Sequence, residues 1–153
     1  MTTALTLFCL AVDIKKAPIG DIFKVIVQSD DDAIDLKDAI KLKKAPRLDN
    51  LPADELFLWK LLKPVRGASA VKTAIEAMVF PDFKPGDAFV ENDTVQLLDS
   101  LTNLSEYWQN LPKRNHLHVV VQVPCKSRLL LDCRTYLTII QLSHHPICQN
   151  IPF

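Results

Sequence analysis

Two histidines open the apolar segment HLHVVVQVP, residues 116–124. Because side chains alternate along a β-strand, His116 and His118 would lie on one face and could supply two zinc ligands. A zinc site needs further ligands, and the neighbouring residues offer no partner cluster. We therefore favour the alternative that this segment is a strand with polar residues at its start.

The thiols and the remaining histidines suggest little chemistry. Four cysteines are present: Cys9, Cys125, Cys133 and Cys148. Their spacing matches no C-x-x-C zinc or redox pattern, and an even count permits two disulfides without requiring them. Cys9 lies in an apolar run and is expected to be a buried small hydrophobe. His144 and His145 with Cys148 resemble a metal cluster only loosely.

Paired carboxylates occur in a turn-rich stretch, and they are the last candidates for catalysis. Paired acids can do acid–base work. These acids lie near prolines with no candidate nucleophile nearby, so we expect a solvated loop. They are Asp82, Asp87, Glu91 and Asp93. With only 3 glycines, a glycine-rich phosphate loop is also excluded. The sequence therefore predicts a protein that is not an enzyme and holds no metal or cofactor.

Length and charge set further bounds. The chain has 153 residues, which suggests one domain long enough to bury a core, with a short appendage. Its formal net charge is zero and its pI is about 6.9, so charge does not direct it toward nucleic acid or an anionic membrane. No apolar run reaches the length of a membrane-spanning helix.

The N-terminal residues are expected to form a β-hairpin. Residues 4–12 could pass for a weak signal peptide, but they lack a basic start and an evident cleavage site, so we favour a first strand. Residues 21–28 follow Pro18 and Gly20, which mark a turn, and read as a second strand.

One amphipathic helix follows the hairpin, within residues 29–46. Ser29 and the acidic residues 30–32 suit its N-terminus, where the helix dipole favours negative charge. Ala33, Leu36 and Ile40 form an apolar stripe at helical spacing. Lysines crowd its other end, where we expect a solvated surface rather than a binding patch, and Pro46 stops it.

The second half of the chain is expected to supply two more strands. Residues 56–62 read as an apolar strand, and residues 68–80 as a short helix. Leu97, Leu101 and Leu104 are spaced to share one helical face. Residues 117–123 are rich in valine, which suits a central strand buried on both sides.

The order of these elements predicts an α+β fold, the ubiquitin-like β-grasp. In it a hairpin leads into one main helix that crosses a mixed sheet. The last strand inserts in the middle, parallel to the first, which would explain why residues 118–121 are so apolar. A fold of this kind says nothing about chemistry by itself.

Three stretches resemble the N-terminal domain of Crinkler effectors, a header domain known from oomycetes and fungi. LTLFCLAV at residues 5–12 is similar to the family's opening strand. DLKDAIKLKK at residues 35–44, followed by LFLWK at residues 56–60, is similar to the helix and the LFLAK-type motif. HVVVQVP at residues 118–124 is similar to the motif that closes this domain.

The resemblance assigns residues to two family motifs. The translocation-like motif comprises Leu56, Phe57, Leu58, Trp59 and Lys60, and the closing motif His118, Val119, Val120, Val121 and Pro124. Asp54 stands where the oomycete motif has its first leucine, and Trp59 replaces its alanine, as we would expect of the fungal branch. Trp59 could be a binding aromatic, although packing in a core is the commoner fate.

The resemblance also implies a role. It implies that residues 4–124 are a ubiquitin-like header domain and residues 125–153 a short extension, too short for the family's variable effector domains. The expected function is non-catalytic: secretion without a convincing conventional signal peptide, and delivery into host cells, with the host nucleus as one destination. Expected partners are proteins, host proteins among them, and neither nucleic acid nor membrane. The alternative is an intracellular ubiquitin-like protein-interaction module.

Overall fold

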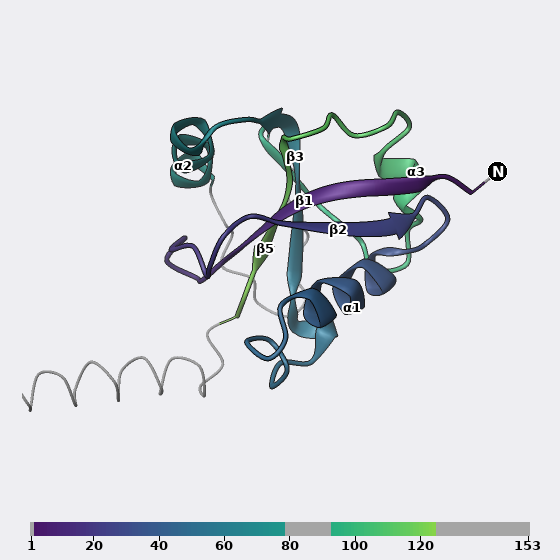
Figure 1. Cartoon of the computed structure of the whole chain (residues 1–153), viewed down its shortest axis with the longest axis horizontal. Coiled ribbons are helices and arrows are strands. Elements are labelled where there is room, and N and C mark those ends of the chain that lie inside the picture. Colours follow the sequence, from purple (N-terminus) through teal and green to yellow (C-terminus); the bar gives the residue numbers. More distant parts are fainter. Residues whose placement is uncertain (1, 79–92, 125–153) are drawn as a thin grey trace, which may run out of the picture.

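The computed structural model describes residues 2–78 and 93–124, which fold around one five-stranded sheet (Figure 1). In chain order the elements are β1 (Ala4–Val12), β2 (Phe23–Gln28), α1 (Ala33–Lys43), the 3₁₀ turn η1 (Ala53–Glu55), β3 (Phe57–Val65), α2 (Ala68–Ala77), β4 (Val95–Leu97), α3 (Leu104–Tyr107) and β5 (Leu117–Gln122). The strands lie in the order β2-β1-β5-β3-β4. The predicted α+β class is confirmed.

The last described strand lies in the middle of the sheet, as expected. β5 runs parallel to β1, with Cys9 beside Val119, and antiparallel to β3 on its other side. The neighbouring pairs β1–β2 and β3–β4 are antiparallel. Val119, Val120 and Val121 are fully buried, so the β-branched run does fill a strand that is covered on both faces.

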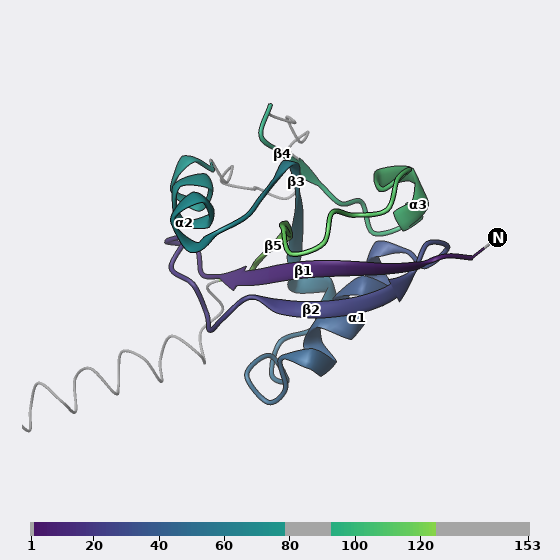
Figure 2. The ribbon, with the colours of Figure 1, turned by 45° about the horizontal axis from the view of Figure 1, so that its top comes forward.

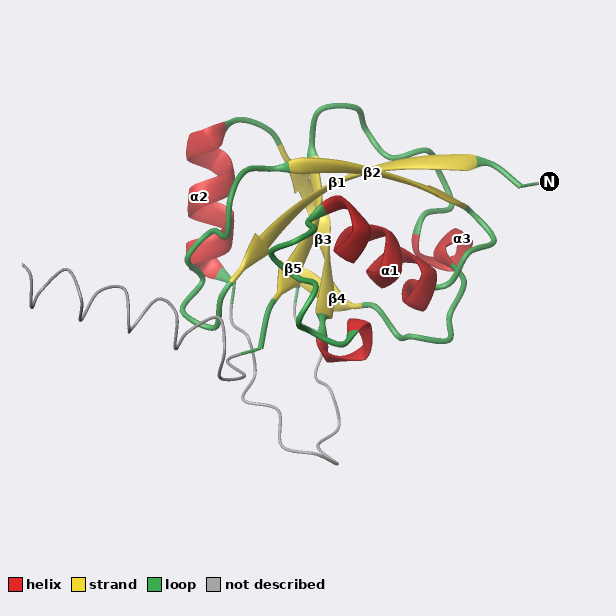
Figure 3. Ribbon diagram, turned by 60° about the horizontal axis from the view of Figure 1, so that its bottom comes forward, coloured by secondary structure: helices red, strands yellow, loops and turns green. Residues whose placement is uncertain are grey.

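The main helix begins where the sequence predicts it. Asp32 is the N-cap of α1: its Oδ1 accepts a hydrogen bond from the Asp35 N–H at 2.9 Å, and the Asp35 side chain reaches back to the Asp32 N–H. The stripe of Ala33, Leu36 and Ile40 is completely buried. Figure 3 shows α1 lying across the strands.

Each face of the sheet carries its own apolar core. Side chains that alternate along β1 and β5 reach opposite faces. Leu7, Cys9 and Val121 pack with α1 in one core, which we call the α1-side core. Leu10 and Val120 pack with Val71 and Ile75 of α2 in the other, the α2-side core. Figure 2 shows the two helices on opposite sides of β1 and β2.

The predicted helical face of Leu97, Leu101 and Leu104 is wrong. Leu97 ends β4, where it pairs with Trp59 of β3, and Leu101 is 80% exposed. Leu104 begins the short helix α3, where its N–H donates to the carbonyl of Asp31 at 2.8 Å. Pairing with β3 and with the turn before α1 therefore decides the backbone here, rather than the local spacing of leucines.

Some sequence predictions lie outside the described residues. These are the proposed loop acids Asp82, Asp87 and Glu91, the cysteines Cys125, Cys133 and Cys148, and the histidines His144 and His145. Cys9 is fully buried, and burial raises the pKa of its thiol, as its place in an apolar run predicts. Within residues 2–78 and 93–124, no helix is long and apolar enough to cross a membrane.

Candidate functional site

The two family motifs form neighbouring strands in the centre of the sheet. We call residues 56–60 the LFLWK segment and residues 118–124 the closing segment. Leu58 pairs with Val121, Trp59 with Val120 and Lys60 with Val119. Segments almost sixty residues apart in sequence therefore share one antiparallel ladder, and a change in either one affects the other.

Most of the LFLWK segment is inaccessible. Leu56 and Leu58 are fully buried in the α1-side core, and Trp59 is fully buried in the α2-side core. Phe57 is partly buried against the α2-side core. A partner that meets the folded domain could therefore not read this segment as a linear peptide.

The buried indole of Trp59 has a polar partner. Its Nε1–H donates to the side-chain oxygen of Gln122 at 3.0 Å. Buried indole N–H groups usually require such an acceptor. Gln122 lies opposite Phe57 in the same ladder, so this bond also ties β3 to β5.

Lys60 anchors the turn around α3 to the sheet. Its ammonium group donates to the backbone carbonyl of Tyr107 and lies 5.4 Å from the centre of the Trp108 ring. That carbonyl lies at the end of α3, where a cation is favourable. Burial lowers the pKa of the Lys60 side chain, because its surroundings solvate the charged form poorly.

His118 completes the hydrogen bonding of β1. Only 1% of it is exposed, and its Nδ1 accepts a hydrogen bond from the Phe8 N–H at 3.1 Å. The imidazole thus replaces a backbone carbonyl at the start of the parallel β1–β5 ladder. Because Nδ1 is an acceptor, the neutral ring must carry its proton on Nε2, which has no well-aligned acceptor among the described residues.

The surroundings of His118 favour this neutral ring. Burial lowers its pKa, the Lys113 backbone carbonyl acts in the opposite direction, and His116 lowers it slightly further. His116 itself is partly buried, and its Nδ1 lies 2.8 Å from the Arg114 carbonyl. The two histidines therefore have separate roles, and the part of the chain that the structure describes contains no group of three residues suited to a metal ion.

The closing segment ends the central ladder. The Val123 N–H donates to the carbonyl of Val12 at 2.9 Å. Pro124 follows and is the last described residue. Proline has no N–H to extend the ladder, which agrees with its predicted role as the end of the strand.

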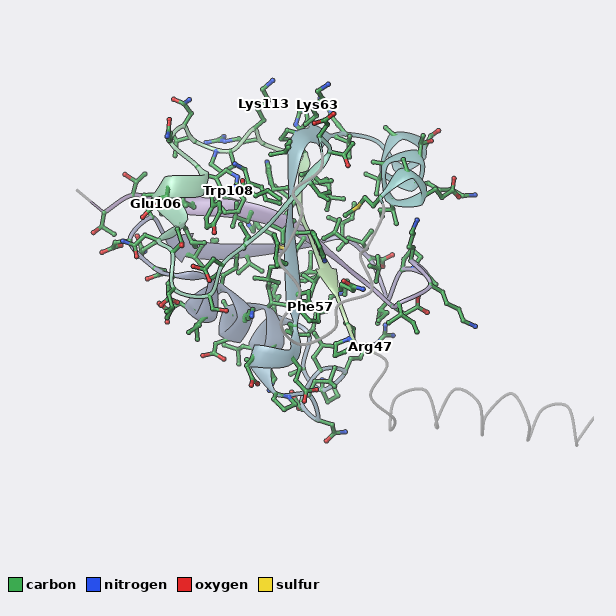
Figure 4. All side chains as sticks on the ribbon, turned by 180° about the vertical axis from the view of Figure 1, so that it is seen from behind. Arg47, Phe57, Lys63, Glu106, Trp108 and Lys113 are labelled. Atoms are coloured by element: carbon green, nitrogen blue, oxygen red, sulfur yellow. The ribbon has the colours of Figure 1, made fainter. Side chains whose placement is uncertain are left out.

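A depression of about 500 Å³ lies where β3, α3 and the start of β5 meet. It is lined by Lys60 and His118, the ionisable residues of the two motifs, and by Trp108, Glu106 and Lys113. Figure 4 shows Glu106, Trp108 and Lys113 in the same upper region of the view. This depression is the place where polar groups of both motifs approach the surface together.

Sequence reasoning missed the partners of the two polar motif residues. Tyr107 and Trp108 follow the expected helical turn, and their aromatic character suggested packing but not contact with Lys60. Nothing in the sequence connects Phe8 with His118, since that contact depends on the parallel pairing of β1 and β5.

The geometry describes a small α+β domain whose two motifs hold its central strands together and present one polar depression. A comparison with protein-family models matches residues 5–122 to the Crinkler effector protein N-terminal domain. The match covers most of the chain, and this protein belongs to that family. A search of the curated proteins finds no match.

Proposed function

We propose that this protein is a Crinkler-type effector header domain that is secreted and delivered into host cells, and that it acts by protein contacts rather than by catalysis. The observation that carries the proposal is the family match over residues 5–122, which spans both motifs. The described residues support the absence of catalysis indirectly, because the ionisable groups of the two motifs, Lys60 and His118, are occupied with backbone partners.

Delivery in this proposal depends on the folded domain. Leu56, Leu58 and Trp59 are fully buried, so a delivery partner that meets the folded protein would contact its surface instead. The depression around Trp108 offers an aromatic ring, a cation and an acid on that surface. Aromatic residues with adjacent charges are typical of protein–protein contacts. We infer that the depression is where a partner protein binds, host proteins among the candidates.

The test is to follow the tagged protein during colonisation of host tissue. An internal tag and microscopy should place the protein inside host cells, with the host nucleus as one destination. Lys113→Glu changes the charge at the depression without touching either core, and we expect it to reduce delivery. Leu42→Asp is the matched control, because Leu42 is 81% exposed on α1.

Retention in the producing cell would contradict the proposal. An intracellular ubiquitin-like interaction module would then be the better interpretation, and capture of resident partners would replace the delivery assay. Equal delivery of the Lys113→Glu variant and the parent would contradict the role of the depression alone.

A further inference from the structure

β2 is an outermost strand of the sheet, and its free edge carries unpaired backbone groups. β1 is its neighbour on one side. The Gln28 N–H points away from β1, because it donates to the Asp31 carboxylate at 2.7 Å, whereas the next residue, Ser29, donates to Thr3 before β1. Backbone groups alternate along a strand, so those of Lys24 and Ile26 also point outward.

The same edge presents a self-complementary row of side chains. Lys24, Ile26 and Gln28 are exposed on one face of β2, and Asp30 follows them beyond the strand end. Ile26 is 58% exposed, which is unusual for an isoleucine in a strand. Lys24 and Asp30 lie on opposite sides of Ile26. A half-turn about Ile26 would therefore bring the lysine of one copy toward the acid of the other.

We propose that two copies of this protein associate through their β2 edges, antiparallel around a two-fold axis at Ile26. The two sheets then form one continuous sheet. Each Ile26 exchanges backbone hydrogen bonds with its counterpart, and each Lys24 N–H meets the Gln28 carbonyl of the second copy. The Asp31 cap on the Gln28 N–H ends the new ladder at that position.

Charge is the reason to choose a second copy as the occupant. A lysine on an edge strand ordinarily discourages pairing with another strand. The penalty disappears where the added strand places an acid diagonally opposite, as Asp30 of a second copy would. Lys24 forms no salt bridge within the described residues, and the Asp30 carboxylate accepts a hydrogen bond from the exposed hydroxyl of Thr2. Both charges are therefore accessible to a second copy.

The experiment is sedimentation velocity on the full chain over a concentration series. The parent should pass from monomer to dimer as concentration rises. Lys24→Glu and Asp30→Lys each place like charges across the two-fold axis, and each should raise the dissociation constant about tenfold. The double variant Lys24→Glu/Asp30→Lys reverses both charges and should restore the parent's dissociation constant. Leu42→Lys, at an exposed position on α1, should leave it unchanged.

Three outcomes would overturn the inference. They are a parent that stays monomeric at every concentration, a dimer that neither single variant weakens, and a double variant that fails to recover association. A β2 edge that pairs with a strand from another protein while the parent stays monomeric belongs to the first. Circular dichroism of each variant verifies that it is folded, since Lys24 and Asp30 are both exposed.

Discussion

Trp59 shows why a motif residue can be recognised in sequence before its role can be assigned. Alternation of apolar residues around it indicates a strand, but a tryptophan in a strand can either pack or bind. The structure buries it completely in the α2-side core and gives its N–H the acceptor Gln122. That acceptor lies on β5, so the sequence near Trp59 could not have indicated it.

Trp59→Ala should destabilise the protein by about 3–5 kcal/mol, because it leaves a large cavity in a fully buried position. Trp59→Phe should cost less, since it keeps most of the apolar volume but leaves Gln122 without its donor. Urea unfolding measures both. Leu62→Ala in the same strand is the control: Leu62 is 43% exposed and should cost about 1 kcal/mol or less. Equal costs for Trp59→Ala and Leu62→Ala would contradict the packing.

The buried ring of His118 should make stability depend on pH. Its pKa is lower in the folded protein than the ordinary value of about 6.5, so the unfolded chain binds the proton more tightly. The contribution of the neutral ring to the free energy of unfolding is therefore complete above about pH 6.5. It is lost as the pH falls below that value, because protonated Nδ1 can no longer accept from Phe8.

His118→Asn tests this directly, because an amide oxygen can accept the Phe8 hydrogen bond but does not titrate in this range. The free energy of unfolding of this variant should vary less between about pH 5 and 7.5 than that of the parent, as urea titrations at each pH would measure. His116→Asn should keep the parent's pH dependence, since His116 lies outside the β1–β5 ladder. An unchanged pH dependence in His118→Asn would show that other groups cause it.

At the scale of elements, local signals predicted α1 most accurately. Its acidic N-cap, apolar stripe and basic end all lie in the sequence that forms it. β4 and α3 were not predicted, because pairing with β3 and with the Asp31 turn decides their backbone. The register that joins the two motifs also depends on contacts between distant residues. The element order and the parallel first–last pairing were predicted, but the two motifs' side-chain partners were not.

Asp32→Ala should cost about 1 kcal/mol of stability, because it removes the side chain that caps the first turn of α1. Asp38→Ala is the matched control, an exposed acid in the middle of the same helix, and it should change the free energy of unfolding by about 0.5 kcal/mol or less. Thermal unfolding of the two variants compares them directly. A larger effect at Asp38 than at Asp32 would contradict the capping box.

At the scale of the whole molecule, the domain should unfold as one cooperative unit. β5 contributes to both cores, and it carries the closing motif, so unfolding of the central strand should remove the LFLWK segment from its buried place. If delivery reads the folded surface, it should be lost with the fold even when the LFLWK sequence is intact.

The most direct test is delivery of a Val121→Asp variant into host cells, measured with a fused reporter. This substitution buries an unpaired charge beside Leu58 and should unfold the domain, while leaving residues 56–60 unchanged. Circular dichroism would verify the unfolding, and Leu42→Asp would serve as the folded control. We expect Val121→Asp to abolish delivery and Leu42→Asp to retain it. Delivery of the unfolded Val121→Asp chain at the parent's level would show that a linear LFLWK peptide suffices, and would contradict a role for the folded surface.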